Sequence, residues 1–388
     1  MQRPPLAFLF VLLLTGTLVA GCTGGPGTGD GMETTPATSP TTGTPPGEEP
    51  EKRWTNPYDF TIRFDAAQAY DDVLWQIYTD PENRTGDRYR IPGSPETQEV
   101  AAWLRDNLEA ALAPIGGTAE ESRFDGATYY GLDHGPDTVE RNTCKPGDER
   151  RERVKDLTFI NVIGRTHTDQ VGLIIGAHYD SKLTASQDPD HAQRDEPLLG
   201  ADDGASGTAA VLNLARALVH DTPDIPLTFI LFDGEDGSED CHPLAGSLHH
   251  AQHGIPEDQR DSVLGMVLLD MVGNASAEFR QLRNTINYVT SGGDTVSSTW
   301  LTYHIWETAA AMGVKAFKNQ TTSPVIDDHI PYLEQGWSAT DIIRFEGGFP
   351  EYWHTTSDDH TAVSVVGLEQ VGVVVEAAVR LYGEEREG

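Results

Sequence analysis

The 388-residue sequence is poor in positive charge. It contains 27 lysines and arginines against 61 aspartates and glutamates, which gives a formal net charge of −34 at pH 7. The acidic residues are dispersed along the chain rather than collected in one tail. Such a chain repels phosphate groups, so the composition argues against nucleic acid as a partner. Dispersed acid instead indicates a solvated, halophile-like surface that keeps a protein soluble.

The N-terminal segment lacks an apolar run long enough to span a membrane. Arg3 precedes a short apolar run over residues 6–14, and "LVAGC" closes it with small residues before Cys22. This pattern is typical of a cleavable secretory signal. A cysteine directly after small residues resembles a prokaryotic lipobox, which implies cleavage before Cys22 and acylation of its thiol.

We therefore expect an extracytoplasmic, membrane-anchored lipoprotein, at a prokaryotic cell surface or in the periplasm. A single acyl chain binds a membrane weakly, so stable attachment needs more than one. The alternative is a secreted protein in which Cys22 is incidental.

Cysteine is otherwise scarce, with Cys144 and Cys241 remaining. Outside the cytoplasm such a pair can form a disulfide, and the sequence leaves open whether the two meet.

Composition divides the chain into three segments and reveals no internal repeat. Residues 1–22 are the signal peptide with its lipobox. Residues 23–53 are rich in Gly, Thr, Pro and Ser with acids, so they cannot bury enough apolar surface to fold, and we expect a disordered tether. Residues 54–388 are within reach of a single large globular domain. Within it, residues 132–156 read as a long irregular insertion of unassigned role.

Three short apolar runs predict strands that are buried on both faces. They cover residues 172–180, 226–236 and 265–273, and each ends in acid or histidine. Between the first two, residues 204–220 have apolar positions at helical spacing. Strand, helix and strand in this order predict an α/β fold: a central, twisted, mainly parallel sheet flanked by helices on both faces. We expect further helices at 96–112, 299–312 and 367–382 and a further strand at 337–343.

Polar side chains follow the predicted strands, at the sheet edge where ligands bind in such folds. The segments are "HYDSK" with His178 and Asp180, "LLGADDGASG" with Asp202 and Asp203, "FDGED" with Glu235 and Asp236, and "LLDMVG" with Asp270. Each alone has an ordinary interpretation, since Asp203 could cap a helix that begins at 204 or 205 and "FDGED" could be a surface turn.

Together these groups favour a metal site. Several carboxylates in one crevice would repel each other unless a cation sat among them. Mixed imidazole and carboxylate ligands suit zinc, which commonly takes three protein ligands. His354, from "GFPEYWHTTSDD", offers a further imidazole. Of the adjacent pair Glu235 and Asp236, one can bind metal while the other acts as general base, and Asp180 can orient the imidazole of His178.

The segments resemble, in chain order, the zinc peptidases of the M28 family, and more closely its glutaminyl cyclase branch. The resemblance runs from about residue 88 to residue 354 and rests on "RYRIPGSPE", "TFINVIG", "HYDSK", "GADDGASG", "FDGED", "LAGSLHHA", "LLDMVG", "DDHIPYL" and "FPEYWHT". It implies zinc held by Asp203, Asp236 and His354. It further implies Glu235 as general acid and base, with Asp270 and Asp327 as additional catalytic carboxylates.

The family contains two activities that the sequence has to distinguish. In its two-zinc aminopeptidases, the resemblance implies that His178 and Asp270 bind the second ion and that Asp203 bridges. In the cyclases one zinc suffices, and Trp353 with Phe349 would wall the pocket for the first side chain of the substrate. In either case the substrates are the N-termini of peptides or proteins.

Three features favour the cyclase. Lys182 follows "HYDS", Asp327 stands where peptidases usually have serine, and a Trp–His pair stands where they more often have Tyr–His. Cys241 and Asp341 depart from the animal cyclases, which have near those positions a pocket tryptophan and a histidine that hydrogen-bonds the catalytic aspartate. We favour the cyclase, with the aminopeptidase as the alternative. A non-catalytic surface module for peptide binding is a third hypothesis, which the complete ligand set disfavours.

Overall fold

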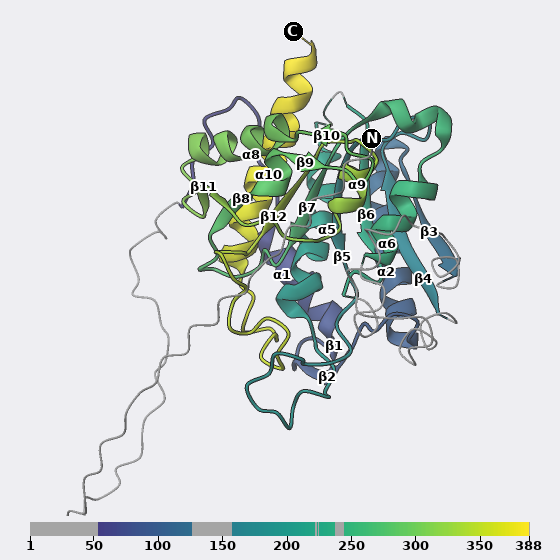
Figure 1. Ribbon diagram of the computed structural model, residues 1–388, viewed down its shortest axis with the longest axis vertical. Coiled ribbons are helices and arrows are strands. Elements are labelled where there is room, and N and C mark those ends of the chain that lie inside the picture. The colour runs from purple at the N-terminus through teal and green to yellow at the C-terminus, as the bar shows by residue number, and fades with distance from the viewer. Residues whose placement is uncertain (1–52, 126–156, 222, 224, 237–243, 388) are drawn as a thin grey trace, which may run out of the picture. The chain divides into compact units, whose positions relative to one another are not determined.

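A six-stranded sheet forms the centre of the computed structural model, which describes residues 53–125, 157–221, 223, 225–236 and 244–387 (Figure 1). The strand order is β12-β7-β5-β6-β4-β3. Strands β12, β7, β5 and β6 run parallel, whereas β4 is antiparallel to β6 and β3 to β4. The expected, mainly parallel sheet is confirmed. Its bounds are β3 (Thr118–Asp125), β4 (Thr158–Arg165), β5 (Gly172–His178), β6 (Leu227–Phe232), β7 (Val263–Asp270) and β12 (Ala339–Ile343).

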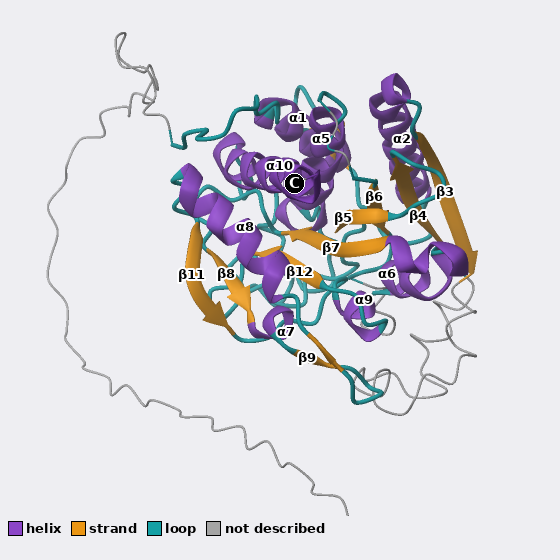
Figure 2. Ribbon diagram, turned by 90° about the horizontal axis from the view of Figure 1, so that it is seen from above, coloured by secondary structure: helices purple, strands orange, loops and turns teal. Residues whose placement is uncertain are grey.

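Helices cover both faces of this sheet, as expected (Figure 2). Successive residues of one strand therefore enter different cores: Ile175 packs in the cluster that includes α5 and α10, and Ile174 in the cluster that includes Tyr332 of α9. Burial on both sides explains why the strands read as unbroken apolar runs. One face carries α1 (Ala66–Ile77), α2 (Pro95–Leu112), α5 (Gly207–Leu218), α8 (Thr299–Met312) and α10 (Val365–Glu387), and the other α6 (Ala245–His249) and α9 (Ile330–Glu334).

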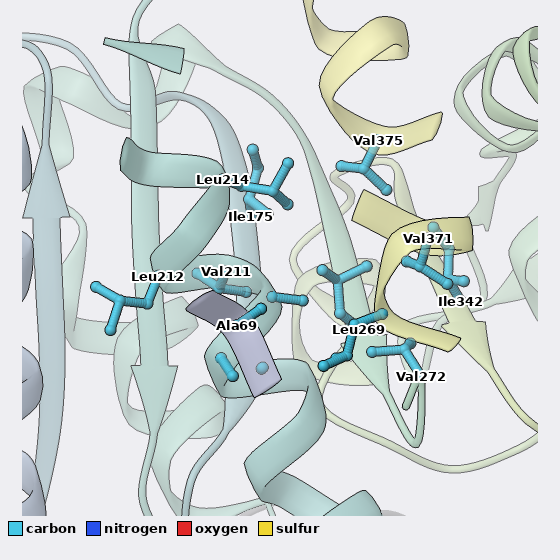
Figure 3. Packing of buried hydrophobic residues seen from close by; sticks show 14 of the residues in the cluster. Ala69, Ile175, Val211, Leu212, Leu214, Leu269, Val272, Ile342, Val371 and Val375 are labelled. Carbon is cyan, nitrogen blue, oxygen red and sulfur yellow. The ribbon is translucent and has the colours of Figure 1, made fainter. Parts of the chain in front are cut away.

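The larger core lies between the sheet and helices α5 and α10 (Figure 3). Val211 and Leu214 of α5 are fully buried there, as is Leu269 of β7. Val371 and Val375 of α10, four residues apart on one helical face, pack into the same cluster. Burying each such side chain contributes about 1.5–3 kcal/mol to the stability of the fold. This packing holds in place the strands whose carboxyl ends carry the polar residues.

Smaller elements surround the sheet. They are the antiparallel pairs β1 (Tyr78–Asp80) with β2 (Thr85–Asp87) and β9 (Tyr288–Val289) with β10 (Thr295–Val296), the parallel pair β8 (Phe279–Leu282) with β11 (Phe317–Thr322), helix α7 (Arg283–Ile286), and short helical turns at Ala113–Ile115, His250–Gly254 and Glu257–Ser262. Among the described residues, no helix combines the length and the apolar character needed to cross a membrane.

The expected elements are present, with one informative difference. The helix predicted at 204–220 begins only at Gly207, after an irregular turn over Ala201–Ser206. Within that turn Gly204 has φ +96°, and a Cβ there would lie 2.8 Å from the ring of His178. Asp203 is therefore not a helix cap, because the chain turns sharply at this point to pass close to the imidazole. Helix α1, capped by Asp65, was not predicted.

Several predictions fall on residues outside the described ranges. They are the signal peptide and lipobox with Cys22, the tether up to residue 52, the insertion at 132–156, and both members of the Cys144–Cys241 pair. The described residues belong to one compact unit.

Candidate metal centre

The carboxyl ends of the parallel strands bring the predicted site residues together. His178 is the last residue of β5, and Asp270 is the last residue of β7. Glu235 and Asp236 follow β6. Three further residues come from loops: Asp203 before α5, Asp327 before α9 and His354 before α10. All are buried except Glu235, which is partly accessible.

Two triads of possible metal ligands share Asp203. In the first, Nε2 of His178 lies 3.2 Å from Oδ1 of Asp203 and 3.3 Å from Oδ1 of Asp270. In the second, Nε2 of His354 lies 3.1 Å from Oδ1 of Asp236 and 3.5 Å from Oδ2 of Asp203. Within each triad the candidate ligand atoms lie within 4.8 Å of one another. The two oxygens of Asp203 thus face different imidazoles, which is the arrangement that a bridging carboxylate requires.

The turn that carries Asp203 is held from both sides. Asp358 accepts the backbone N–H groups of Asp202 (2.8 Å) and Asp203 (3.1 Å). On the other side, the fully buried guanidinium of Arg90 donates to the carbonyls of Tyr179 (2.6 Å), Leu199 (2.7 Å) and Gly200 (2.7 Å). Arg90 therefore ties the end of β5 to the start of the Asp203 turn, and it brings a positive charge beneath a negative site.

His354 is fixed by its backbone and by aromatic neighbours. Its φ of +54° is unusual for a residue with a side chain, and such strain persists only where the surroundings enforce it. The backbone N–H of Gln187 donates to its carbonyl at 3.0 Å. Trp353 stacks on the imidazole with ring centroids 3.7 Å apart, and Phe349 stacks on Trp353 at 4.0 Å. Trp353 and Phe349 are only half-buried, so part of this stack remains accessible.

Asp180 links His178 to Glu235. Its Oδ1 accepts the backbone N–H of Glu235 at 3.1 Å and lies 3.5 Å from Nδ1 of His178. Burial raises the pKa of Glu235 well above its ordinary value, with the charges of Asp236 and Asp327 adding to the effect and that of His178 opposing it. A carboxyl with a raised pKa beside a metal cradle is suited to take and return a proton near neutral pH.

The pKa of Asp236 shifts in the opposite direction from that of Glu235. Burial by itself would raise its pKa, but the charges of Lys182 and His354 outweigh burial and hold the pKa of Asp236 well below its ordinary value. The ammonium of Lys182 lies 3.6 Å from Oδ1 of Asp236. Of the adjacent pair, Asp236 is therefore the one suited to bind a cation as an anion, and Glu235 the one suited to carry a proton.

The electrostatics of the site fit a divalent cation. Burial raises the pKa of Asp270 well above its ordinary value and that of Asp327 to about 6, with neighbouring carboxyls contributing to both. Burial would lower the pKa of His178, but hydrogen bonds with Asp180, Asp203 and Asp270 raise it well above 6.5. Without a metal, the site must take up protons to balance its charge. A dication between the carboxylates removes that need, and the imidazole and carboxylate donors suit zinc.

Two supporting residues were not predicted. Arg90 lies in "RYRIPGSPE", and nothing in that segment distinguishes a fully buried arginine from an exposed one. Asp358 follows His354 by four residues in a stretch rich in acid, where the sequence pattern gives no sign that it accepts two backbone N–H groups. The role of each depends on the path of a distant loop, which only the folded chain defines.

A parallel sheet with two imidazole–carboxylate triads at the carboxyl ends of its strands defines a metal-dependent α/β enzyme. The chain belongs to peptidase family M28, whose profile matches residues 161–379. The expected fold and family are thereby confirmed.

Individual relatives include both activities of the family. The chain is 23% identical over 317 residues to the glutaminyl-peptide cyclotransferase of Boiga irregularis, covering 76% of this chain and 77% of that protein. It is 29% identical over 189 residues to aminopeptidase YwaD of Bacillus subtilis (strain 168), covering 46% and 37%. The crystal structure of Porphyromonas gingivalis glutaminyl cyclase matches with a TM-score of 0.65 and 24% identity, over 83% of this chain and 100% of that one. This structural likeness establishes the fold.

Proposed function

We propose that the protein is a zinc-dependent glutaminyl-peptide cyclotransferase, which converts N-terminal glutamine of peptides to pyroglutamate with release of ammonia. The observation that carries the proposal is the aromatic stack of Phe349 and Trp353 on His354, adjoining the buried acids of the site. A flat apolar surface suits the side chain of glutamine, and the acids attract a free amino terminus. Relatives named as cyclotransferases, which align over 76% of this chain, support the same activity.

Asp203, Asp236 and His354 would hold the zinc of the cyclase. Bound zinc supplies a Lewis acid that polarises the side-chain carbonyl of the substrate glutamine. Asp236 is suited to this role because its pKa is lowered, so it remains an anionic ligand at neutral pH.

Glu235 carries the proton in the proposed reaction. The α-amine attacks the side-chain carbonyl carbon, a new C–N bond closes the lactam ring, and the bond to the departing nitrogen breaks. Glu235 accepts the proton that the amine loses and returns it to the leaving ammonia, so no water is consumed. The charge of Asp327 contributes to the raised pKa of Glu235, and Oδ1 of Asp270 lies 3.3 Å from Nε2 of His178 in the same site. We assign both carboxyls to orienting the amine.

The aminopeptidase is the second candidate, because the triad of His178, Asp203 and Asp270 is also complete. With two zinc ions bound, Glu235 would accept a proton from a water that attacks the first peptide bond. The intact ligand sets argue against a module that only binds peptides.

Two peptides that differ only in their first residue, glutamine or leucine, separate the candidates. The zinc-loaded full chain should release ammonia from the first peptide and leave the second unchanged. Release of free leucine from the second peptide would favour the aminopeptidase. Turnover of neither peptide would reject both enzymes.

We also propose that the mature protein is attached to the outer face of a membrane through acylated Cys22, where it meets peptide and protein N-termini. The lipobox pattern at residues 18–22 supports this location. Expression of Cys22→Ser in a bacterial host tests it: the variant should leave the membrane fraction, whereas equal membrane retention of both forms would contradict the anchor.

A further inference from the structure

Asp202 is fully buried but belongs to neither triad of candidate ligands. It directly precedes Asp203, and its two carboxyl oxygens accept hydrogen bonds from different parts of the chain. Oδ1 accepts the backbone N–H of Gly273, in the segment after β7, at 2.7 Å. Oδ2 accepts the hydroxyl of Tyr352, two residues before His354. Asp202 therefore joins the turn of one candidate ligand to the loop of another.

The direction of the hydrogen bond between Tyr352 and Asp202 follows from a third residue. Nη1 of Arg344, directly after β12, donates to the hydroxyl oxygen of Tyr352 at 3.0 Å. Because an arginine side chain has no acceptor, the hydroxyl accepts from Arg344 and directs its own hydrogen to Asp202. The guanidinium carbon of Arg344 also lies 5.4 Å from the centroid of the Tyr352 ring. The phenol is thus held between two partners, and its hydroxyl is not available to a substrate.

Two hydrogen-bonded connections hold the loop of His354 against the turn of Asp203. Tyr352, before His354, bonds to the side chain of Asp202. Asp358, after His354, accepts the backbone N–H groups of Asp202 and Asp203. His354 itself has φ +54°, and a residue keeps such a conformation only where its surroundings impose it. With one connection removed, the loop is free to relax at this residue.

We propose that Tyr352 is a positioning residue of the metal centre. Its hydrogen bond to Asp202 fixes His354 relative to Asp203, so that Nε2 of the imidazole and Oδ2 of the carboxylate stand 3.5 Å apart before an ion binds. Ligands held in place in this way lose less freedom on binding, which favours metal affinity. The inference rests on the proposed zinc site of Asp203, Asp236 and His354, and it is independent of the choice between cyclase and aminopeptidase.

Tyr352→Phe in the full chain removes the hydroxyl and keeps the aromatic ring. We expect its zinc dissociation constant, measured by competition with a chelator, to rise about 10-fold, the lower end of the loss typical for residues that orient metal ligands. With zinc in excess, kcat should return to within about threefold of the wild type and KM should stay unchanged. A zinc affinity equal to that of the wild type would overturn the proposal. A raised KM with zinc in excess would overturn it as well, because Tyr352 would then be a contact of the substrate.

A double-mutant cycle tests whether Tyr352 acts through Asp202. Asp202→Ala removes the acceptor of the Tyr352 hydroxyl together with that of the Gly273 N–H, so it should weaken zinc binding at least as much as Tyr352→Phe. Adding Tyr352→Phe to Asp202→Ala should then cause less than about a twofold further loss, because the partner is already absent. Losses that multiply in the double variant would contradict the proposal. If Asp202→Ala does not fold, the affinity of Tyr352→Phe alone decides.

Tyr89→Phe is the matched control. It also removes a hydroxyl that donates to an aspartate, but the acceptor is Oδ2 of the exposed Asp87 at 3.2 Å. Its zinc affinity should equal that of the wild type. An equal loss of affinity in Tyr89→Phe and Tyr352→Phe would mean that the effect does not come from the connection to Asp202, and would overturn the proposal.

Thermal unfolding separates positioning from a merely structural role. A structural contact lowers the melting temperature by the same amount with and without zinc, whereas weaker metal binding lowers it more when zinc is present. We therefore expect the difference between Tyr352→Phe and the wild type to be larger in zinc than in chelator. Equal differences in the two conditions would contradict the proposal.

The zinc measurements need no substrate, so failure of this inference is distinct from failure of the proposed function. A protein that releases no ammonia but binds zinc about 10-fold more weakly as Tyr352→Phe would reject the cyclase and retain the role of Tyr352. An active cyclase with unchanged zinc affinity in Tyr352→Phe would do the reverse.

Discussion

The indole of Trp353 lies on the imidazole of His354, with ring centroids 3.7 Å apart and planes inclined by 19°. The stack therefore restrains the imidazole of a candidate metal ligand and at the same time contributes a partly accessible aromatic surface. His354 has φ +54°, so the aromatic contact acts on a backbone that is already strained. One side chain is thus placed to influence both metal binding and substrate binding.

Trp353→Ala should weaken both zinc binding and substrate binding. Aromatic pairs contribute about 0.5–1.5 kcal/mol beyond burial, so we expect about a three- to tenfold loss of zinc affinity together with a raised KM for glutamine-initiated peptides. Titration against a chelator measures the first effect and steady-state kinetics the second. Trp300→Ala, on α8, is the control, since Trp300 is partly exposed and stacks on Tyr382. Equal losses in both variants would contradict the role of the stack.

Glu235→Gln should abolish turnover without releasing zinc. The amide cannot accept the proton of the attacking amine, and general acid–base catalysis contributes about 100- to 10,000-fold. Glu235 belongs to neither ligand triad, so metal content should match that of the wild type. Metal analysis and ammonia release on the same preparation check the prediction. A Glu235→Gln variant that keeps its activity would remove this residue from the mechanism.

The stability of the metal-free protein should fall as pH rises. Burial raises the pKa of Asp327 to about 6, against about 3.9 in an unfolded chain. A carboxyl whose pKa is raised by folding binds its proton more tightly in the folded state. Its contribution is therefore complete below about pH 4 and is lost as pH rises through about 6. A shift of about two pKa units corresponds to roughly 3 kcal/mol, and the raised pKa values of Glu235 and Asp270 act in the same direction.

Urea unfolding in the presence of a chelator at pH 5, 6 and 7 measures this decline. Zinc should remove it, because the metal stabilises the ionised carboxylates. Asp327→Asn should make the decline shallower. A metal-free protein whose stability increases over this range would show that the acids of the site are paired in another way.

Arg90→Met should destabilise the protein strongly and weaken zinc binding. The substitution leaves three buried carbonyl acceptors without a donor and removes the positive charge beneath Asp180 and Asp203. Removing one partner of such a buried charge network costs about 3–5 kcal/mol. Arg105→Met, which breaks only partly exposed pairs with Asp106 and Glu121, should cost less than about 1 kcal/mol. Similar midpoints of denaturant unfolding for the two variants would contradict this role of Arg90.

The parts of the fold that depend on short segments could be predicted from the sequence. The strands around His178 and Asp270 are buried on both faces, so they appear as continuous apolar runs, and the polar residues that follow them meet at one edge of a parallel sheet. The start of α5 could not be predicted, because the turn at Gly204 is forced by the approach of His178 from another strand. The partners of Arg90 are carbonyls far away in the chain, which leave no pattern in the local sequence.

The most direct test of the proposed activity is mass spectrometry of a glutamine-initiated peptide after incubation with the zinc-loaded full chain, with Glu235→Gln as the blank. The cyclotransferase predicts loss of one ammonia from a peptide whose chain remains intact. Loss of the whole first residue would contradict it, and would instead assign His178 and Asp270 to a second zinc of an aminopeptidase.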